Sequence, residues 1–333
     1  MSKKIKLINK SFSIVLETEN LGMAGVEDLE KSLNSLKSQK YPIKKAKEVL
    51  IIAGGHVSED VQKRLKKKYP WVTIKKTKEH LDYVGAKAVG SKIAKGDILI
   101  FVDSDSVYEK GWLGNMLKVF SDFPDADVVS GNTEPRINSN YAMSLTLAWM
   151  FIIRGPIRKT KEVYEVPMNN FAIKRNALLK VPLPKNLPFY RSGSIWKNWL
   201  IENGLKIYTT PNVMGYHATP ANLRDWWYRM LINGRDFVAL GDYTFKGMKL
   251  IEKKSVLKRF MNLVAWSGWK TLQVFVNVYK TVNKDKKTIQ YLLLGVPFAL
   301  LDVSIIILGS LITFINRDYL LKIVTAYEAE HVV

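Results

Sequence analysis

The sequence predicts an α/β fold in which a mostly parallel, twisted sheet is flanked by helices and followed by amphipathic and apolar membrane-binding helices. Three observations predict it. Short apolar runs alternate with helical stretches over the first 130 residues, one of these runs is apolar throughout, and a basic block leads into a long apolar segment near the end. The alternation is typical of a parallel sheet with helices on its faces.

The strands are expected where the short apolar runs lie. The run 98–102 is apolar at all five positions, as a strand buried on both faces should be. Helical stretches of about ten to fifteen residues separate the runs, which is an ordinary length for a helix that covers a sheet. The expected strands are 12–16, 49–52, 72–74, 98–102 and 128–129, and the helices between them include 26–39 and 82–95.

Residues 131–240 are less regular. The pattern there predicts helices at 141–153 and 194–203, a strand at 171–174 and further strands near Ile207 and Val213.

The third section starts near residue 241. An amphipathic helix is expected at 256–279, with Trp266 and Trp269 as interface anchors. Its apolar stripe consists of Leu257, Met261, Val264, Gly268, Leu272, Phe275 and Tyr279.

The distribution of charge favours a membrane surface as a partner. The chain has 51 Lys and Arg against 30 Asp and Glu, a net charge of +21, which suggests a polyanionic partner. Residues 246–287 hold 11 of the basic residues and only two acids, and they lead into the apolar segment 289–315. Basic residues that border an apolar segment indicate anionic lipid rather than nucleic acid, and no nucleic-acid module is evident.

The absence of cysteine excludes several chemistries. With no Cys in 333 residues, a disulfide framework, a Cys-based zinc site and thiol catalysis are ruled out, and a reducing compartment is favoured. The basic N-terminus has no apolar core behind it of the length a signal peptide needs. We therefore expect the chain to start in the cytoplasm and its folded part to lie on the cytoplasmic side of a membrane.

The sharpest chemical signal is Asp103-Ser104-Asp105, directly after the apolar run 98–102. In open α/β sheets, ligands bind just beyond the carboxyl ends of the strands. Two carboxylates one residue apart at that edge suit a hard divalent ion that bridges a diphosphate.

Five segments in order resemble the family 2 glycosyltransferases, which have the GT-A fold and move a sugar from a nucleotide donor. The segment 85–90, Gly-Ala-Lys-Ala-Val-Gly, looks like the family's Gly-x-Ala-Arg-Asn-x-Gly helix, and 103–105 looks like its Asp-x-Asp metal motif. The others are 13–20, 169–175 and 207–235. The resemblance implies a nucleotide-sugar-binding half at 1–130, an acceptor-binding half at 131–240 and a membrane-associated section at 241–333.

The resemblance also implies roles for single residues, with Mn²⁺ or Mg²⁺ as cofactor and a UDP- or GDP-linked sugar as donor. Asp105 and His217 would bind the metal, and Asp103 would lie near the ribose or help to hold the metal. Asp103, Asp105 and Arg191 are the candidate catalytic residues. The candidates for donor binding are Glu17, Asn20, Lys87, Asp103, Ser104, Arg224 and Arg229, and those for acceptor binding are Asn169, Asn170 and Arg191.

Two departures from the family pattern bear on the donor nucleotide and on the acceptor, respectively. Residues 52–56 lack the acids that often follow the second strand, and residues 191–193 read Arg-Ser-Gly where the family has an acidic general base. A sugar hydroxyl needs such a base, whereas a phosphate acceptor is already ionised and needs only cations to hold it. The acceptor is thus either a lipid phosphate held by Arg191 or a hydroxyl on a lipid or glycan. The cations near Arg191 would be Arg154, Arg158 or Lys159, and the bases for a hydroxyl would be Glu134, Glu165 or Asp225.

Other interpretations remain open at the level of sequence. A catalytically silent homologue that binds nucleotide, or a basic nucleic-acid-binding protein, would share much of this pattern. The apolar segment 289–315 contains Gly295, Pro297 and Asp302. It could be a single tilted span, a shallow interfacial hairpin or a buried pair of core helices.

Overall fold

The central element is an eight-stranded sheet. The computed structural model describes residues 10–18, 25–53, 57–77, 81–148, 157–184, 193–220, 222–240, 243–246, 249–252 and 255–323. The sheet order is β3-β2-β1-β4-β9-β6-β10-β8, and the strands from β3 to β4 are parallel. Their bounds are β1 Phe12–Glu17, β2 Glu48–Ala53, β3 Thr73–Lys76, β4 Ile98–Val102, β6 Val128–Ser130, β8 Lys161–Glu162, β9 Asn170–Lys174 and β10 Ile207–Thr209.

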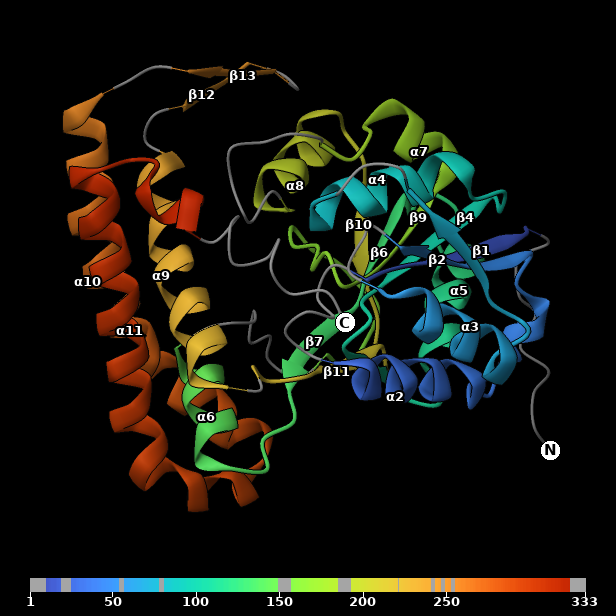
Figure 1. Cartoon of the computed structure of the whole chain (residues 1–333), viewed down its shortest axis with the longest axis horizontal. Coiled ribbons are helices and arrows are strands. Elements are labelled where there is room, and N and C mark those ends of the chain that lie inside the picture. The colour runs from blue at the N-terminus through green and yellow to red at the C-terminus, as the bar shows by residue number, and fades with distance from the viewer. Residues whose placement is uncertain are drawn as a thin grey trace.

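Helices cover both faces of this sheet (Figure 1). One core lies between the sheet and α2 (Val26–Lys37), α3 (Glu59–Lys68) and α5 (Trp112–Asp122). The other lies between the sheet and α4 (Tyr83–Ile93), α7 (Arg175–Lys180) and α8 (Gly193–Glu202). Because every residue of β4 is buried, the strand contributes to both cores, as its uniformly apolar sequence predicts.

A second sheet of three short strands lies beyond the carboxyl end of β4. Its order is β5-β11-β7, with bounds Ser106–Tyr108, Met214–His217 and Asn132–Pro135. Strand β11 pairs antiparallel with β5, which places His217 opposite Ser106. This pairing brings a residue from the third quarter of the chain beside the loop that follows β4.

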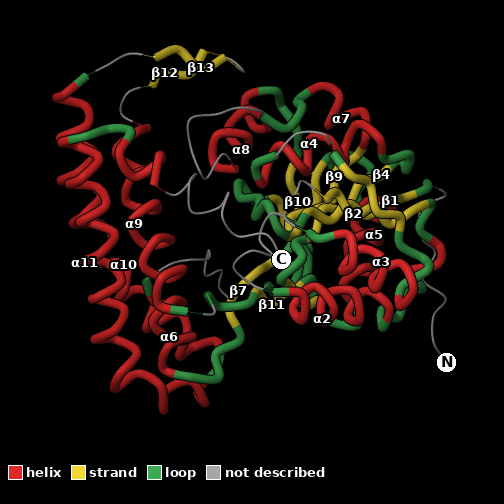
Figure 2. Tube along the Cα trace, in the orientation of Figure 1, coloured by secondary structure: helices red, strands yellow, loops and turns green. Residues whose placement is uncertain are grey.

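The remaining helices form a layer at one side of the molecule (Figures 1 and 2). It contains α6 (Asn140–Leu147), α9 (Leu223–Ala239), α10 (Val256–Lys284) and α11 (Leu292–Ile315), with the 3₁₀ turn Lys286–Tyr291 before α11. Two apolar clusters hold these helices together. Two further strands, β12 (Tyr243–Lys246) and β13 (Lys249–Glu252), form a hairpin, and a 3₁₀ turn lies at Ile43–Lys45.

The predicted α/β fold is confirmed, and the apolar runs lie at the strands. The strand 98–102 has the predicted bounds, and the others differ by a residue or two. The helix expected at 141–153 is described as α6 from 140 to 147, and residues 149–156 lie outside the described chain. Strands β5 and β7 were not predicted. They are only three and four residues long, too short to show an alternation of polar and apolar side chains.

The layer at the side draws on more of the chain than the proposed section 241–333. Helices α6 and α9 come from 131–240, yet they pack on α11 and share its apolar clusters. Within the described residues, one helical stretch, Lys286–Ile315, is long and apolar enough to cross a membrane, and 44% of its most apolar part is buried inside the protein.

Candidate active site

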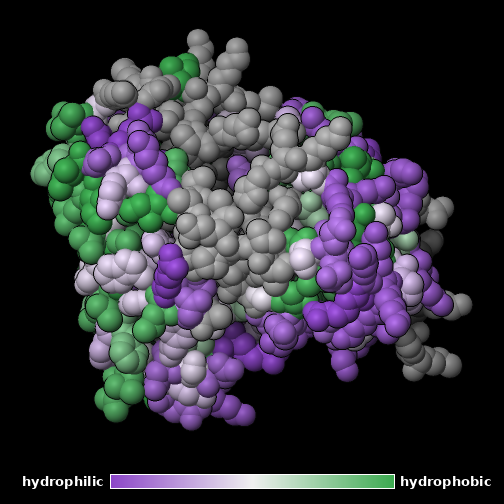
Figure 3. Space-filling view, viewed as in Figure 1, coloured by the Kyte–Doolittle hydropathy of each residue, from purple (hydrophilic) through white to green (hydrophobic). Residues whose placement is uncertain are grey.

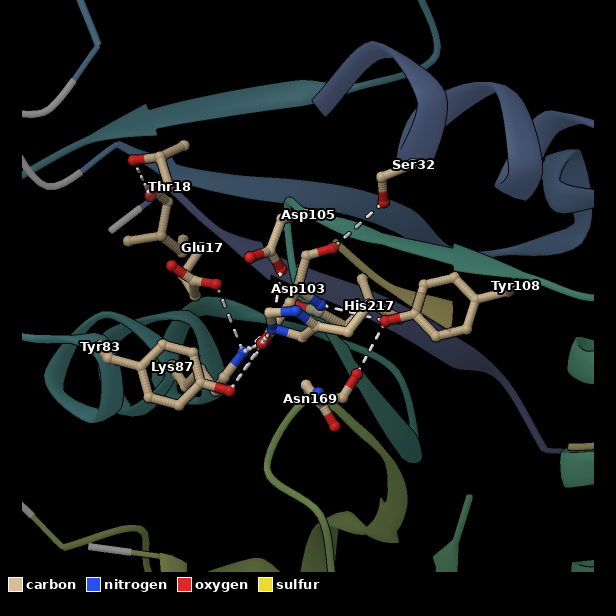
Figure 4. Close-up of polar contacts among 12 residues, drawn as sticks. Glu17, Thr18, Ser32, Tyr83, Lys87, Asp103, Asp105, Tyr108, Asn169 and His217 are labelled. Carbon is tan, nitrogen blue, oxygen red and sulfur yellow. Dashed lines mark hydrogen bonds and ion pairs between the residues drawn. The ribbon is translucent and has the colours of Figure 1, made fainter. Parts of the chain in front are cut away.

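Three buried ligand groups meet at the carboxyl end of β4. One oxygen each from Asp103 and Asp105 and a ring nitrogen of His217 lie within 4.8 Å of one another. His217 Nε2 is 3.2 Å from Asp105 Oδ1 and 3.9 Å from Asp103 Oδ2. Figure 4 shows the three side chains converging, two from the loop after β4 and one from β11. Such a set of oxygen and imidazole ligands suits Mn²⁺ or Mg²⁺.

Hydrogen bonds fix the orientation of His217. Its Nδ1 lies 2.6 Å from the Ala218 carbonyl, which can only accept, so Nδ1 carries the proton. Nε2 then faces the two carboxylates. The backbone of the next residue is held too, because the Ala218 amide donates to the Asp105 carbonyl. A carbonyl partner on the far nitrogen is the usual way a metal-binding histidine is oriented.

Among the three ligand groups, the environment of Asp105 fits a bound cation best. The side chain is 3% exposed, and among the described residues no hydrogen-bond donor reaches Oδ1. Burial raises the pKa of this carboxyl, against the opposing effect of His217. Oδ1 and Nε2 lie 3.2 Å apart, a separation at which a proton or a metal ion can bridge them.

Asp103 is already neutralised by a buried lysine. Lys87 Nζ donates to Asp103 Oδ1 at 2.6 Å and lies 3.8 Å from Glu17 Oε1. The Tyr83 hydroxyl lies 2.9 Å from both Asp103 oxygens, and the Lys87 ammonium lies over the Tyr83 ring. Both Lys87 and Glu17 are fully buried. The network holds Asp103 in place (Figure 4) and leaves Asp105 as the carboxylate with coordination to spare.

Tyr108 connects the loop that carries Asp103 and Asp105 to Asn169, which directly precedes β9. The family resemblance predicts that this strand lines the acceptor side. Its hydroxyl accepts from the Asp103 amide at 3.1 Å and donates to the Asn169 carbonyl at 2.7 Å. Burial raises the pKa of this phenol well above its ordinary value, so it stays protonated and keeps the donor. Asn169 thus enters the site region through its backbone (Figure 4).

Asn170, predicted to bind the acceptor, has its amide engaged within the fold. Its Oδ1 accepts from Trp112 Nε1 at 2.7 Å, and its Nδ2 donates to the carbonyls of Asn132 and Val213. The side chain therefore joins the central sheet to the small sheet. Its proposed role in acceptor binding stays a prediction, and the structure gives the amide these three partners within the fold.

The remaining predicted site residues are distributed as follows. Ser104 is buried beside the two aspartates. Arg229 lies on α9 and lowers the pKa of Asp105, so its charge acts at the metal cluster. Arg224 is exposed and lies over the Tyr228 ring. Asn20 and Arg191 lie outside the described residues.

The three candidate general bases are all engaged. Glu134 accepts from Lys284 Nζ at 2.6 Å, and because it pairs with Tyr216 in the small sheet it points to the face opposite His217. Glu165 pairs with Lys197 at 3.0 Å. Asp225 is buried and bonded to Asn222, the N-cap of α9.

A cavity of about 780 Å³ adjoins the metal cluster. It lies between α2 and the small sheet, and Asp105 and His217 form part of its wall. Basic groups on its other walls are Lys31, Lys110 and Arg136. The cluster therefore faces a space large enough for a small ligand.

Sequence reasoning missed Tyr83 and Tyr108. A signal existed for Tyr83, because it precedes Lys87 by four residues and the two therefore share one face of α4. Tyr108 had none, since its role depends on a contact with Asn169 that is 61 residues away in the chain.

Comparisons with known proteins agree with this geometry. Residues 23–181 match the family model "Glycosyl transferase family 2". The mannosyltransferase PcManGT from Pyrobaculum calidifontis, solved with GDP-Man and Mn²⁺, superposes with a TM-score of 0.58 at 15% identity, over 93% of this chain and 88% of that one. GalNAc-T7, solved with UDP, GalNAc and Mn²⁺, gives 0.51 at 14% identity, over 64% of this chain and 44% of that one. A comparison with curated protein sequences finds no match.

Proposed function

We propose that this chain, whose residues 23–181 match the family 2 glycosyltransferase model, transfers a sugar from a nucleoside-diphosphate donor to a membrane-linked acceptor in a metal-dependent reaction. The observation that carries the proposal is the buried group Asp103, Asp105 and His217, whose ligand atoms lie within 4.8 Å of one another and could hold a metal ion. The site lies where the end of β4 and the small sheet meet, which is the expected place for a ligand in an open α/β sheet.

Different side chains would hold the cation, orient its ligands and contact the donor. Asp103, Asp105 and His217 would hold the cation, which supplies Lewis-acid stabilisation of the departing diphosphate. Lys87 and Tyr83 keep Asp103 oriented, and Arg229 adds positive charge on the same side as Asp105. Glu17, at the end of β1, lies 3.8 Å from Lys87 Nζ and is the proposed contact to the ribose or base. Solved structures with this fold that hold GDP-Man or UDP support a UDP- or GDP-linked donor.

The acceptor that best fits these contacts is a phosphate, such as a polyprenyl phosphate. The three candidate bases are each tied to a cation or a helix cap, so none is poised to take a proton from a sugar hydroxyl. A phosphate oxygen can attack the anomeric carbon directly while the bond from that carbon to the diphosphate breaks. In-line attack of this kind inverts the anomeric centre.

The proposed membrane association is supported by the C-terminal section. The basic block 246–287 and the apolar helix α11 together favour anionic lipid. The cytoplasmic leaflet is the proposed location, supported by its anionic surface and by the lack of cysteine in the chain.

Donor binding tests the proposed site. We expect Mn²⁺ together with the right UDP- or GDP-sugar to raise the melting temperature of the native chain, and Asp105→Asn to remove that response. Asp60→Asn, a change at a carboxylate that is 94% exposed on α3, is the matched control and should keep it. An undiminished Mn²⁺-dependent response in the Asp105 variant would refute the site.

Acid lability of the product tests the acceptor. Membranes incubated with radiolabelled donor should yield a lipid product that mild acid hydrolyses, because a sugar–phosphate bond is acid-labile. An acid-stable product would point to a hydroxyl acceptor and exclude the phosphate.

A further inference from the structure

Helix α10 exposes its apolar face and buries several polar side chains, the reverse of what is usual for a helix on the surface of a water-soluble domain. Its buried residues are Leu263, Lys270, Val274, Asn277 and Thr281. The apolar stripe is exposed instead: Leu257, Met261, Val264, Leu272, Phe275 and Tyr279 each keep more than half of their surface. Such an apolar surface marks an interaction site.

The buried polar residues of α10 have a structural role. Lys270 Nζ donates to the Ala148 carbonyl at 3.2 Å, and Asn277 Nδ2 donates to the Leu147 carbonyl at 3.0 Å. These carbonyls lie at the C-terminal end of α6, where helix carbonyls have no partner of their own. The bonds fix the rotation of α10 about its axis, so its apolar stripe must face outward.

Apart from Asp302, helix α11 has no charged residue. Only one of its faces is buried. Gly234 of α9 and Gly309 of α11 let the two backbones touch, since a Cβ added at Gly234 would lie 1.8 Å from the Ile306 carbonyl oxygen. Ser310 Oγ also donates to the Gly234 carbonyl at 3.0 Å. The opposite face is exposed from one end of the helix to the other, through Leu293, Leu294, Phe298, Leu301, Leu308, Leu311 and Ile315.

Helices α9 and α11 run side by side in the same direction. Trp226 Nε1 donates to Asp302 at 2.7 Å near the start of α9, and Gly234 contacts Ser310 two turns later. The N-terminal half of α11 packs on α6, where Gly295 meets Met143. The whole length of α11 is therefore attached to helices of the catalytic domain, and α9 carries Arg229, whose charge acts on Asp105.

This attachment excludes a spanning orientation. A helix of 24 residues is about 36 Å long, enough to cross a hydrocarbon core of about 30 Å. If α11 crossed the membrane, α6 and α9 would lie at the same depth and would carry the metal cluster into the hydrocarbon. A nucleotide sugar could not reach such a site from water.

We propose that α10 and α11 form one monotopic docking surface that lies flat in the headgroup region of an anionic bilayer, with neither helix crossing it. Figure 3 shows hydrophobic side chains gathered along the edge of the molecule that α10 and α11 occupy in Figure 1. Exposed Lys280, Lys286 and Lys287 lie at the end of α10 and in the following turn, where they can meet anionic headgroups. The proposal rests on the membrane attachment proposed above and adds its geometry.

Depth measurement tests the flat orientation. Because the chain has no cysteine, Leu293→Cys, Leu301→Cys and Ile315→Cys each give one labelling site on the exposed face of α11. Full-length protein with a fluorophore at one of these sites is bound to vesicles of phosphatidylcholine with one-third phosphatidylglycerol, which contain nitroxide lipids of known depth. A flat helix predicts one shared depth, about 5–10 Å below the headgroup boundary.

Two outcomes would overturn the proposal. A spanning helix would place the probe at position 301 near the bilayer centre, about 15 Å deep, with the other two near opposite surfaces. No quenching at any position would mean no docking. Donor hydrolysis by the same samples reports separately on the catalytic site, so a failure of docking is distinguishable from a failure of the proposed reaction.

A charge placed in the docking surface gives an independent test. We expect Leu272→Glu to weaken sedimentation with the same vesicles at least tenfold, since it removes an exposed apolar contact and adds a like charge to the bilayer. Leu179→Glu, at a leucine of α7 that is equally exposed but outside the surface, should bind as the native chain does. Equal binding by both variants would contradict the assignment of the surface.

Discussion

The pH dependence of stability caused by Asp302 tests whether this face of α11 is buried against α9. This carboxyl is 1% exposed, its Oδ1 accepts from Trp226 Nε1, and burial raises its pKa from 3.8 to about 6. A raised pKa means that the folded state prefers the protonated form. Ionisation of Asp302 therefore lowers the free energy of unfolding as pH rises from 3.8 to 6, and the loss is complete above that range.

The size of the effect follows from the shift. A shift of about two pKa units corresponds to about 3 kcal/mol lost at neutral pH. Asp302→Asn stays neutral and keeps an oxygen for Trp226, but its new NH₂ replaces a buried carboxyl oxygen, at a penalty of about 1 kcal/mol. We expect the variant to be less stable by about 1 kcal/mol at pH 4 and more stable by about 2 kcal/mol at pH 7.5.

Thermal unfolding in detergent, scanned from pH 4 to 8, measures the difference. For a chain of 333 residues, about 2 kcal/mol corresponds to a rise of roughly 3 °C in melting temperature. Asp318→Asn, at a carboxylate that is 60% exposed just beyond α11, is the control and should show no pH-dependent difference. If the difference between Asp302→Asn and the native chain is the same at every pH, the carboxyl is not ionised in a buried site and the reasoning fails.

Three further predictions use the same contacts. Lys87→Met leaves two buried carboxylates without their cation and should destabilise the fold by about 3–5 kcal/mol in thermal denaturation, whereas Lys118→Met, in an exposed pair, should change it by less than about 1 kcal/mol. Gly309→Ala places a methyl 2.1 Å from a backbone oxygen of α9 and should lower the melting temperature, while Gly268→Ala on α10 has open space and should not. Glu134→Gln should keep kcat for glycosyl transfer within about twofold, because Glu134 faces away from the metal cluster; a loss of a hundredfold or more would restore it as the base.

Local sequence was enough to predict where the two aspartates lie, because one motif directly follows one strand. Asp103 and Asp105 are placed by β4, whose five apolar residues require burial on both faces, and Lys87 is placed by the helix before it. Asn170 shows the limit of this reasoning. It lies in the predicted strand, but its amide bonds to Trp112 and to two backbone carbonyls from other strands, and such long-range contacts leave no pattern in the chain.

The helices at the side show a different limit. The stripe from Leu257 to Tyr279 predicts an amphipathic helix, and that helix is present, but periodicity does not say which face is turned to water. That choice depends on Lys270 and Asn277, which bond to the end of α6, more than a hundred residues earlier in the chain. Trp266 is affected by the same packing: proposed as an interface anchor, it instead stacks on Phe237 of α9, and Trp269 is the exposed member of the pair. The sequence thus supplies the apolar surface, and the polar contacts of α10 decide that this surface faces outward.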